Sequence, residues 1–525
     1  MKNFLLALLL ALPVCGHATT AAAQFVEVPL SGAEQKRLGA ILGFLKAFYA
    51  ARGDTPAWAD PKDVQTALTV IAEAEADGLD PEDFAFTKLQ AMAQQGHSRE
   101  LDIQLTANIA LLGYVLRNGK TDPNDLLLSG FWERVSKSDP AFDLNYAIEG
   151  GILREVIGRL RPQFAYYGQL QRALTDLNAV SARGGWPQVS EGPTLRLGDR
   201  GPRVAEVIQR LASGGYMATI AMVGADPGDV FDEGVQQAVR DFQIAHGEDP
   251  DGIVGSKTIA AMNVSVLDRI DQLRVNLERA RWIGELRDER HIIVNIAGYY
   301  AAVIEDGRPV WTTRVIVGDE YTRTPVFLDE IEYLEFNPTW TAPRSIIQNE
   351  LAPKIIADPR YLERNDYYLA EANGRRVSPS SVDFSTLTPR NFPYWVVQEP
   401  GDKNALGRVK FVFPNAHSVY MHDTPSRQLF DKTKRTFSHG CIRTENPLEL
   451  AELLLSDQGW DAARIQSVLA SGQRTRVPLE TSVPVAILYW TADPTPSGVR
   501  FYPDIYGRDA AVLEALNTPL QLSDR

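Results

Sequence analysis

The chain has 525 residues, a length that predicts several domains rather than one small fold. Hydrophobic residues make up 44% and charged residues 23% of the sequence, a globular composition that excludes a disordered or fibrous protein. The formal net charge is −14, and the sequence has no long run of Lys or Arg. Nucleic acid and anionic membranes are therefore not expected as partners, because both require clustered positive charge.

The N-terminus has the pattern of a secretory signal peptide. A basic start at Lys2 is followed by an apolar run over 4–14 and by three alanines at 21–23. We therefore expect residues 1–23 to be removed and the mature protein to act in the periplasm without stable insertion in a membrane. A retained anchor is the alternative, but the apolar run is shorter than the ~20 residues that cross a bilayer.

The region 24–185 is predicted to be a helical scaffold. Apolar residues recur there at steps of three and four, as at Leu38, Ile41 and Leu45, and no catalytic constellation is evident. Glycines and prolines over 184–193 then indicate a linker to the next part of the chain.

A small helical module is expected over 192–265. Three short helices with glycine-containing turns are indicated by the stretches LRLGDRGPRV, FDEGVQQAVRDFQ and DGIVGSKTIAAMN. These stretches resemble the three-helix type of peptidoglycan-binding domain. The resemblance implies that the module binds the cell wall, with a spacer between domains as the alternative. An amphipathic connecting helix is expected to follow within 266–290.

From residue 291 the periodicity changes from helical to strand-like. Runs of strand character occur at 292–296, 310–317, 331–336, 409–413 and 418–421. They predict a β-rich domain over 291–510, which makes the fold class multidomain α+β. The interval 345–404 lacks such a pattern, and we expect it to be an irregular insertion that caps the β core. Residues 511–525 are expected to be a C-terminal tail.

The reactive side chains gather around Cys441, which is the single cysteine outside the predicted signal peptide. It lies in the segment SHGCIR, with His439 two residues before it and His422 further upstream. A cysteine becomes a nucleophile when an imidazole or nearby positive charge favours its thiolate. We expect His422 to be the base, because a neighbouring strand can place it on the line of proton transfer. A buried inert cysteine is the alternative.

Other groups near the motif would complete a site for acyl transfer. Backbone amides around Gly440 and Cys441 can stabilise an oxyanion, and Arg443 offers a planar fork for a substrate carboxylate. Trp340 and Tyr420 are candidates to line the cleft, although aromatic residues of a β domain commonly belong to its core. Zinc is the rival interpretation, but one cysteine with two or three histidines is an unusual zinc ligand set. We expect neither a metal nor another cofactor.

HDTP at 422–425 and SHGC at 438–441, followed by Arg443, resemble the signature of L,D-transpeptidases with a YkuD-type catalytic domain. The stretches FNPTWTAPRSI and KNALGRVKFVFPN are similar to the large periplasmic, YcbB-like members of that family. Those members carry a helical scaffold, a peptidoglycan-binding module and a capping insertion in the catalytic domain. The resemblance implies that His422 is the base, Cys441 the acylated nucleophile, and the carbonyl of Asp423 the group that orients the His422 ring.

The resemblance also implies roles for the residues next to these. His439 and Gly440 are expected to help form the oxyanion site, and Arg443 is expected to line the substrate pocket. Ser438, Tyr420 and Trp340 are the further residues expected in substrate-binding positions.

The resemblance implies a specific reaction on peptidoglycan. Such enzymes attack a tetrapeptide stem at the bond between its third residue and the terminal D-Ala, and release that D-Ala. The acyl group then passes to an amine of a second, acceptor stem, giving a 3→3 crosslink, and carbapenems are expected to trap the cysteine. The residues alone predict acyl transfer without separating an amine acceptor from water. An L,D-carboxypeptidase, an enzyme that attaches a protein to the wall, and a non-catalytic wall-binding scaffold remain as alternatives.

Overall fold

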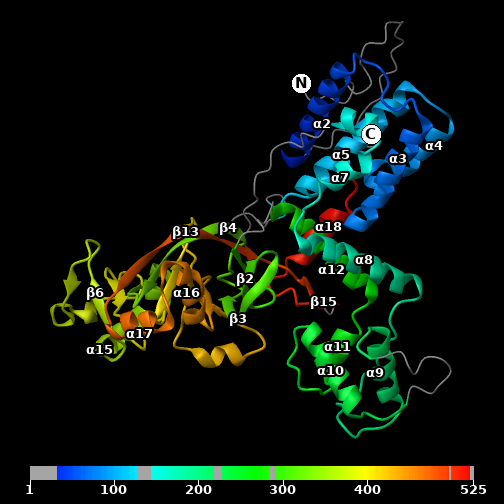
Figure 1. Cartoon of the computed structure of the whole chain (residues 1–525). Coiled ribbons are helices and arrows are strands. Elements are labelled where there is room, and N and C mark those ends of the chain that lie inside the picture. The colour runs from blue at the N-terminus through cyan, green and yellow to red at the C-terminus, as the bar shows by residue number, and fades with distance from the viewer. Residues whose placement is uncertain are drawn as a thin grey trace.

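The fold is described from a computed structural model over residues 32–123, 126, 143–217, 228–283, 290–495 and 498–520. The predicted signal peptide, 1–23, lies outside these residues. In the ranges described, none of the helices combines the length and apolar character needed to span a bilayer. A helical N-terminal part, a small helical module and a β-rich part follow one another along the chain, which confirms the expected α+β class (Figure 1).

The helical scaffold is built around one long, almost entirely buried helix, α5 (Arg99–Asn118). Ser98 caps it, since its hydroxyl oxygen accepts a hydrogen bond from the amide of Leu101 at 3.1 Å. The other scaffold helices are α2 (Gly32–Ala51), α3 (Pro61–Ala72), α4 (Phe86–Gln94), α6 (Leu144–Glu149), α7 (Leu153–Gly158) and α8 (Ala165–Ala182), with the short 3-10 helices η2 (Glu73–Asp77) and η3 (Pro81–Phe84).

The small module contains the three expected helices, α9 (Pro202–Ser213), α10 (Glu233–Ala245) and α11 (Ser256–Met262). Their apolar faces meet in a core of the module's own, which includes Val207, Phe231 and Phe242. The module lies at the opposite end of the molecule from the scaffold (Figure 1). It is therefore a separate packing unit, as its sequence pattern indicates.

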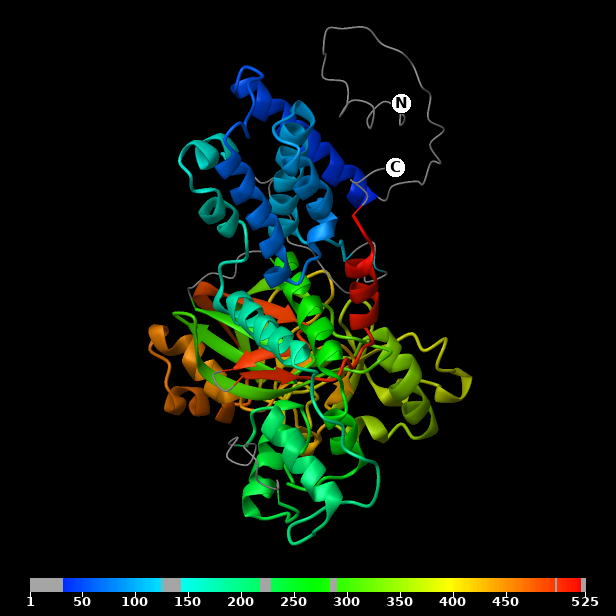
Figure 2. The same cartoon turned by 90° about the vertical axis from the view of Figure 1, so that its right-hand side faces the viewer.

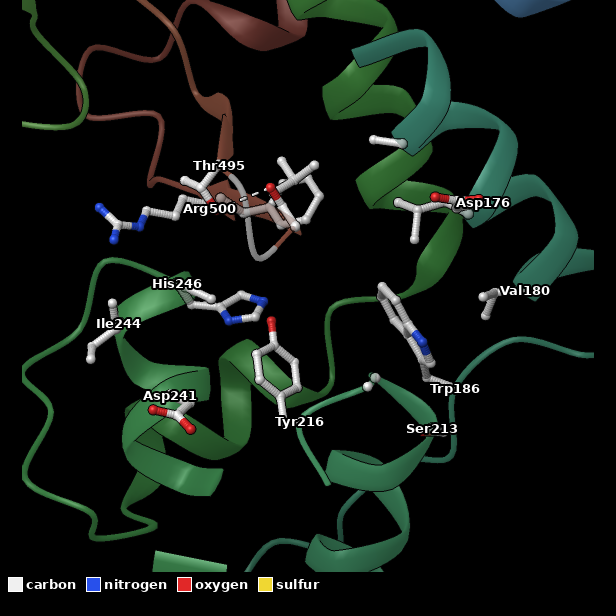
Figure 3. Close-up of a pocket in the computed structure, with 18 of the residues that line it drawn as sticks. Asp176, Val180, Trp186, Ser213, Tyr216, Asp241, Ile244, His246, Thr495 and Arg500 are labelled. Carbon is white, nitrogen blue, oxygen red and sulfur yellow. Dashed lines mark hydrogen bonds between the residues drawn. The ribbon is translucent and has the colours of Figure 1, made fainter. Parts of the chain in front are cut away.

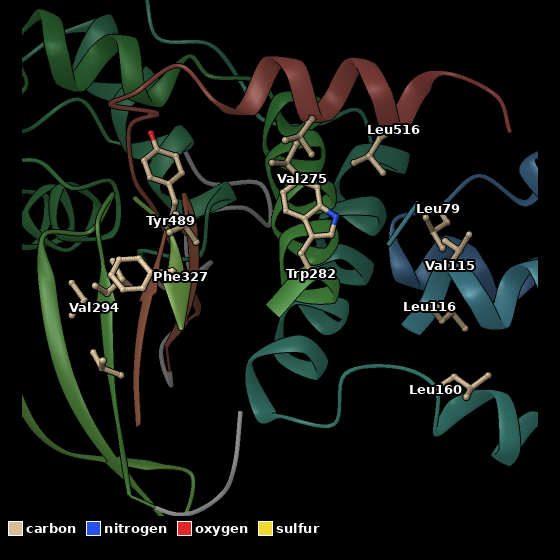
Figure 4. Close-up of a cluster of buried hydrophobic side chains, with 14 of the residues drawn as sticks. Leu79, Val115, Leu116, Leu160, Val275, Trp282, Val294, Phe327, Tyr489 and Leu516 are labelled. Atoms are coloured by element: carbon tan, nitrogen blue, oxygen red, sulfur yellow. The ribbon is translucent and has the colours of Figure 1, made fainter. Parts of the chain in front are cut away.

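Helix α12 (Val266–Ile283) connects all parts of the molecule. Its Val275 and Trp282 belong to one continuous apolar core that extends from scaffold residues such as Val115 to sheet residues such as Phe327 (Figure 4). Of the described residues beyond 510, those up to 517 belong to α18 (Asp509–Asn517), which packs against α12 and returns the chain to the scaffold (Figure 2). The C-terminal residues thus contribute to this core through Leu516.

The β-rich domain contains a sheet that closes on itself. Its strands are β1 (His291–Asn295), β2 (Tyr300–Glu305), β3 (Arg308–Gly318), β4 (Phe327–Phe336), β9 (Val409–Val412), β10 (Met421–His422), β11 (Thr436–Ser438), β12 (Ile442–Thr444) and β13 (Thr475–Leu488). Their order is β11-β3-β12-β10-β9-β4-β13-β1-β2, and a further pairing of β2 with β3 completes the closure. The remaining elements outside the insertion are the helices η8 (Arg427–Asp431), α16 (Pro447–Leu455), η9 (Ser456–Gln458) and α17 (Ala462–Ala470), and the hairpin β14 (Ala492–Thr495) with β15 (Gly498–Phe501).

The strand expected at 418–421 is wrong, because β10 begins only at Met421. Ser418 has a φ of +57°, a left-handed conformation that a strand cannot contain. The side chain of Asn415 accepts hydrogen bonds from the amides of His417 and Val419, which closes a tight loop before β10.

The irregular structure expected for the insertion is also wrong. Residues 340–398, which we call the inserted subdomain, form a second sheet of order β5-β8-β6-β7 with its own apolar core. Its strands are β5 (Trp340–Thr341), β6 (Tyr367–Ala370), β7 (Arg376–Val377) and β8 (Trp395–Gln398). Its helices are α13 (Arg344–Ile346), the π-helix η5 (Ile347–Leu351), α14 (Ala352–Ala357), α15 (Tyr361–Arg364), η6 (Pro379–Ser381) and η7 (Phe384–Thr386).

Candidate active site

Two short parallel strands bring the predicted catalytic residues together. His422 of β10 lies opposite Arg443 of β12, and the amide of Ile442 donates to the carbonyl of Tyr420 at 3.0 Å. Side chains alternate along a strand, so His422 and Arg443 share one face. Tyr420 and Cys441 lie directly before the two strands, and the Tyr420 ring is 5.6 Å from the His422 ring between centroids.

The thiol of Cys441 lies in a half-buried position beside Tyr420. Burial raises the pKa of Cys441, whereas hydrogen bonds from the amide and the hydroxyl of Tyr420 lower it. The thiol also contacts the carbonyl oxygen of Ser418 at 3.8 Å. Trp340, from the first strand of the inserted subdomain, hydrogen-bonds the Tyr420 hydroxyl. The expected cleft residues Tyr420 and Trp340 thus form one chain of contacts with Cys441.

His422 is held as a neutral imidazole with a defined tautomer. Its side chain is buried, and Nδ1 lies 2.5 Å from the carbonyl oxygen of Asp423. A carbonyl can only accept, so Nδ1 carries the proton and Nε2 is left as an acceptor. Burial is the main cause that lowers the pKa of His422 to about 3, with smaller contributions from the charges of Arg443 and Lys410. This histidine is therefore unprotonated at Nε2 at neutral pH, so that Nε2 is available as a hydrogen-bond acceptor.

The turn before Cys441 is held by Ser438 and Gly440. The Ser438 hydroxyl donates to the carbonyl of Cys441 at 2.5 Å and accepts from the amide of Gly440 at 3.1 Å. Gly440 has a φ of +110°, which an L-residue rarely adopts. The amide of Gly440, one of the expected oxyanion donors, is thus already engaged. No hydrogen bond from the amide of Cys441 is recorded among the described residues.

His439 and Arg443 each have a hydrogen-bond or ion-pair partner of their own, and neither shares the partner of His422. His439 Nε2 lies 2.9 Å from Glu350 Oε1 of the inserted subdomain, and both side chains are exposed by 45%. Arg443 donates to the carbonyl of Phe437 at 3.3 Å, and burial lowers its pKa. In the part of the chain that the structure describes, no group of three or more His, Cys, Asp and Glu side chains is arranged to hold a metal ion.

Lys410 is a charged neighbour of the site that the sequence analysis missed. It lies on β9 directly opposite His422 of β10, and its Nζ is 3.8 Å from the centre of the Tyr420 ring. Burial alternates along Val409–Val412, with Val409 and Phe411 buried, so Lys410 falls on the less buried face of the strand. A lysine between two apolar residues could have been noticed in the sequence. The sequence does not show, however, that β10 with His422 lies beside it.

Hydrogen bonds from distant parts of the chain hold the turn at Gly440, and the sequence analysis did not predict them. The hydroxyl of Thr324 donates to the carbonyl of Gly440 at 2.9 Å and accepts from the amide of Gly318 at 2.9 Å. The hydroxyl of Tyr506 donates to the carbonyl of Gly318 at 2.6 Å and accepts from the amide of Thr324 at 3.2 Å. The turn is thereby fixed to the loop after β3.

A pocket of about 730 Å³ lies elsewhere, where the module meets α8 and the β14–β15 hairpin (Figure 3). Trp186, Tyr216 and His246 of the module side face Asp176 of α8 and Arg500 of the hairpin across it (Figure 3). None of the residues of the SHGC motif line this pocket. It is therefore a feature of the domain junction and separate from the reactive cysteine.

Three family models match successive parts of the chain. Residues 43–174 match a scaffold domain, residues 200–262 match the family described as "Putative peptidoglycan binding domain", and residues 289–485 match the L,D-transpeptidase catalytic domain of the YkuD type. The last match includes the turn and both strands that carry the site.

A curated protein of Haemophilus influenzae, named "Putative L,D-transpeptidase", is 38% identical over 241 residues, which are 46% of this chain and 48% of that protein. The chain thus matches about half the length of this relative. Among solved structures, an L,D-transpeptidase of Xylanimonas cellulosilytica is 15% identical, with a TM-score of 0.18, and covers 57% of this chain and 99% of its own. The catalytic domain of an E. faecium L,D-transpeptidase, acylated by ertapenem, is 13% identical, with a TM-score of 0.18, and covers 39% and 99%. The assignment of the domains therefore rests on the sequence matches.

Proposed function

We propose that this chain, which carries a catalytic domain of the L,D-transpeptidase family, forms 3→3 crosslinks in peptidoglycan through an acyl-enzyme at Cys441. The scaffold and peptidoglycan-binding domains beside it support action on the cell wall outside the cytoplasm. The observation that supports the proposal is the pairing of β10 with β12, which brings Cys441 beside Tyr420 and His422, together with the Nδ1 contact of His422 that leaves Nε2 as an acceptor.

In the proposed first half-reaction, the stem carbonyl before D-Ala is attacked by the sulfur of Cys441 while His422 Nε2 takes the thiol proton. The amide of Cys441 donates to the resulting oxyanion. Collapse of the tetrahedral intermediate breaks the C–N bond, and His422 returns the proton to the departing D-Ala amine. Because the pKa of His422 is about 3 in the free protein, proton transfer accompanies attack rather than preceding it.

In the second half-reaction, an amine of the acceptor stem attacks the thioester carbonyl. His422 takes a proton from this amine and the thiolate of Cys441 leaves, so that an amide replaces the thioester. Water in place of the amine would give a carboxypeptidase, and a protein amine would give attachment of that protein to the wall. These alternatives use the same residues and differ only in the acceptor.

The neighbouring residues take supporting roles in this proposal. Arg443 is the ligand for a carboxylate of the donor stem, and Trp340 and Tyr420 form the wall beside the thiol. Ser438 and Gly440 shape the turn, since their polar groups are used within it. His439 links this turn to the inserted subdomain through Glu350, a contact that supports a position of the subdomain beside bound substrate.

The test is mass spectrometry of the protein incubated with a disaccharide-tetrapeptide, with Cys441→Ala as the control variant. Dimers joined through two third-position residues, together with released D-Ala, are expected from the wild type and not from the variant. Tripeptide without dimers would indicate the carboxypeptidase. No turnover and no acyl-enzyme would contradict both and favour the non-catalytic scaffold.

A carbapenem provides a second readout, because it acylates the nucleophile without an acceptor. We expect one covalent adduct on the peptide that contains Cys441 and none in Cys441→Ala. A wild-type protein that remains unmodified would contradict the assignment of Cys441 as the nucleophile.

A further inference from the structure

We propose that Lys410 is a positioning residue that keeps Cys441 reactive by acting through Tyr420. Its ammonium group lies on the face of the Tyr420 ring and strengthens the hydrogen bond that the phenol donates to the sulfur of Cys441. This inference rests on the proposed function, in which Cys441 is the nucleophile.

The geometry forms a line from charge to sulfur. Lys410 Nζ is 3.8 Å from the ring centre of Tyr420, well within the range of a cation–π contact. The hydroxyl of the same ring interacts with the Cys441 sulfur, and this interaction lowers the pKa of the thiol. A cation on the ring withdraws electron density from it and makes the phenol a better donor, as polarised hydrogen-bond chains do. The pairing of Lys410 with His422 across β9 and β10 fixes the lysine backbone in this register.

The ammonium group of Lys410 does not form an ion pair with a neighbouring carboxylate among the described residues. On its other side β9 pairs with β4, where Glu335 lies opposite Lys410 and attracts its charge. A carboxylate oxygen of Glu335, however, lies 2.7 Å from the guanidinium of Arg474, so Glu335 forms its ion pair with that arginine. Among the described residues, no hydrogen bond or ion pair of the Lys410 ammonium is recorded. Burial lowers the pKa of Lys410, while Glu335 and the Cys441 thiolate raise it.

Other groups near the sulfur cannot replace this contribution. His422 is neutral at rest, so the positive charge near Cys441 comes from Lys410 and Arg443. Arg443 donates to the backbone at Phe437, and within the described residues Lys410 is the cation found over the Tyr420 ring. The removal of Lys410 therefore weakens both the field at the sulfur and the hydrogen bond that stabilises the thiolate.

The test is the pH dependence of alkylation of Cys441 by iodoacetamide, read by mass spectrometry of the peptide that contains Cys441. For Lys410→Met we expect the midpoint of the alkylation rate against pH to rise by about one pH unit. At a pH below this midpoint the fraction of thiolate, and with it the alkylation rate, should then fall about tenfold. The limiting rate at high pH should stay close to that of the wild type. Lys410→Arg should retain most of the wild-type profile, because the cation–π contact survives.

Lys434→Met is the matched control, because it removes the same charge from an exposed position shortly before the SHGC turn. Its profile should match the wild type. Lys410→Gln serves as a second uncharged variant if the methionine variant does not fold. An unchanged midpoint in a folded uncharged variant would overturn the proposal, and an increase in KM for the tetrapeptide with an unchanged midpoint would instead make Lys410 a substrate ligand.

Alkylation requires no stem peptide, so the two proposals fail separately. A protein that shows the expected shift but forms neither dimers nor an acyl-enzyme would contradict the proposed function and still support the role of Lys410.

Discussion

Gly440 places the reactive sulfur through its backbone conformation. Its φ of +110° lies in a region that favours glycine, and its carbonyl is held by Thr324. A Cβ at this position would have its nearest neighbours at 3.7 Å and 3.9 Å, which is ordinary contact. The requirement for glycine is therefore conformational and not a lack of space.

Gly440→Ala is expected to affect both the stability of the protein and the position of the Cys441 sulfur, and the two effects can be measured separately. The strained backbone should cost about 1–3 kcal/mol. A displacement of the sulfur by about 1 Å should slow crosslinking by about 100-fold or more. Thermal unfolding and the dimer assay measure the two effects.

Gly472→Ala is the matched control for this variant. Gly472 follows α17, has a φ of +65° and has open space around it, so alanine there strains the backbone without touching the turn. It should lose comparable stability and keep the wild-type rate. Equal loss of rate in both variants would mean that destabilisation, rather than the turn, controls activity.

The proposed catalytic residues could be singled out from the sequence because they lie in two short local motifs. Cys441, His439 and Gly440 are consecutive, and the carbonyl that holds His422 belongs to the next residue. Lys410 and Tyr506 could not be predicted in the same way. Their approach depends on which strands are neighbours and on the path of the C-terminal segment, and neither is encoded in local periodicity.

At the scale of elements, length decided which predictions succeeded. Long amphipathic helices such as α12 and strands such as β4 carry enough residues to show a period. The strands of the inserted subdomain have two or four residues each, which is too short for alternation to be recognised. Their pairing joins residues that are distant in the sequence, such as Ala370 of β6 and Trp395 of β8, and only the folded chain reveals it.

Helix α10 ends in a buried histidine that links the module to the β14–β15 hairpin. His246 stacks on Phe242 at 3.9 Å between ring centres and faces Phe501 of the hairpin at 6.1 Å. Its Nδ1 lies 2.7 Å from the carbonyl of Phe242. Burial lowers the pKa of His246 to about 3, and the nearby guanidinium groups of Arg269 and Arg210 add to the effect.

This histidine should make stability depend on pH in a defined window. The unfolded chain binds a proton at His246 below a pH of about 6.5, whereas the folded chain does not until about 3. The free energy of unfolding should therefore fall as the pH drops through this window. From pH 7 to 5.5 the loss from His246 alone should be about 1 kcal/mol, or roughly 2–4 °C in Tm.

His246→Gln removes this proton uptake from the unfolded chain. The variant should be less stable than the wild type at pH 7, yet its Tm should fall by less on acidification to pH 5.5. Differential scanning calorimetry at the two pH values measures both. If the Tm of the variant falls as steeply as that of the wild type, the protonation of His246 does not cause the pH dependence of stability.

At the scale of the whole molecule, the parts are joined by polar contacts as well as by the apolar core. The hydroxyl of Thr433, in the loop before β11, donates to a carboxylate oxygen of Asp249 in the module at 2.5 Å. Glu278 of α12 accepts from the amide of Thr121 at 2.6 Å and pairs with Arg281. The module thus contacts the segment that leads to the reactive turn, while α12 is bonded to the scaffold.

The C-terminal helix is fastened to the scaffold by a buried ion pair. Lys120 Nζ lies 2.5 Å from Asp83 Oδ2, and both side chains are exposed by only 3%. The same ammonium donates to the carbonyl of Leu516 at 2.6 Å, and Asp83 accepts from the amide of Leu520 at 3.0 Å. Burial raises the pKa of Asp83 and lowers that of Lys120, so each charge depends on the other.

Lys120→Met should therefore destabilise the junction strongly, by about 3–5 kcal/mol, because it leaves a buried carboxylate without its cation. The double variant Lys120→Met with Asp83→Asn removes both charges and should recover much of this loss. Arg375→Met, which breaks an exposed pair with Glu371, should leave the Tm close to that of the wild type, because water screens exposed pairs. Thermal unfolding measures all three, and protease cleavage after residue 508 reports whether α18 has detached. A double variant as unstable as Lys120→Met would mean that lost packing, rather than an unpaired charge, weakens the junction.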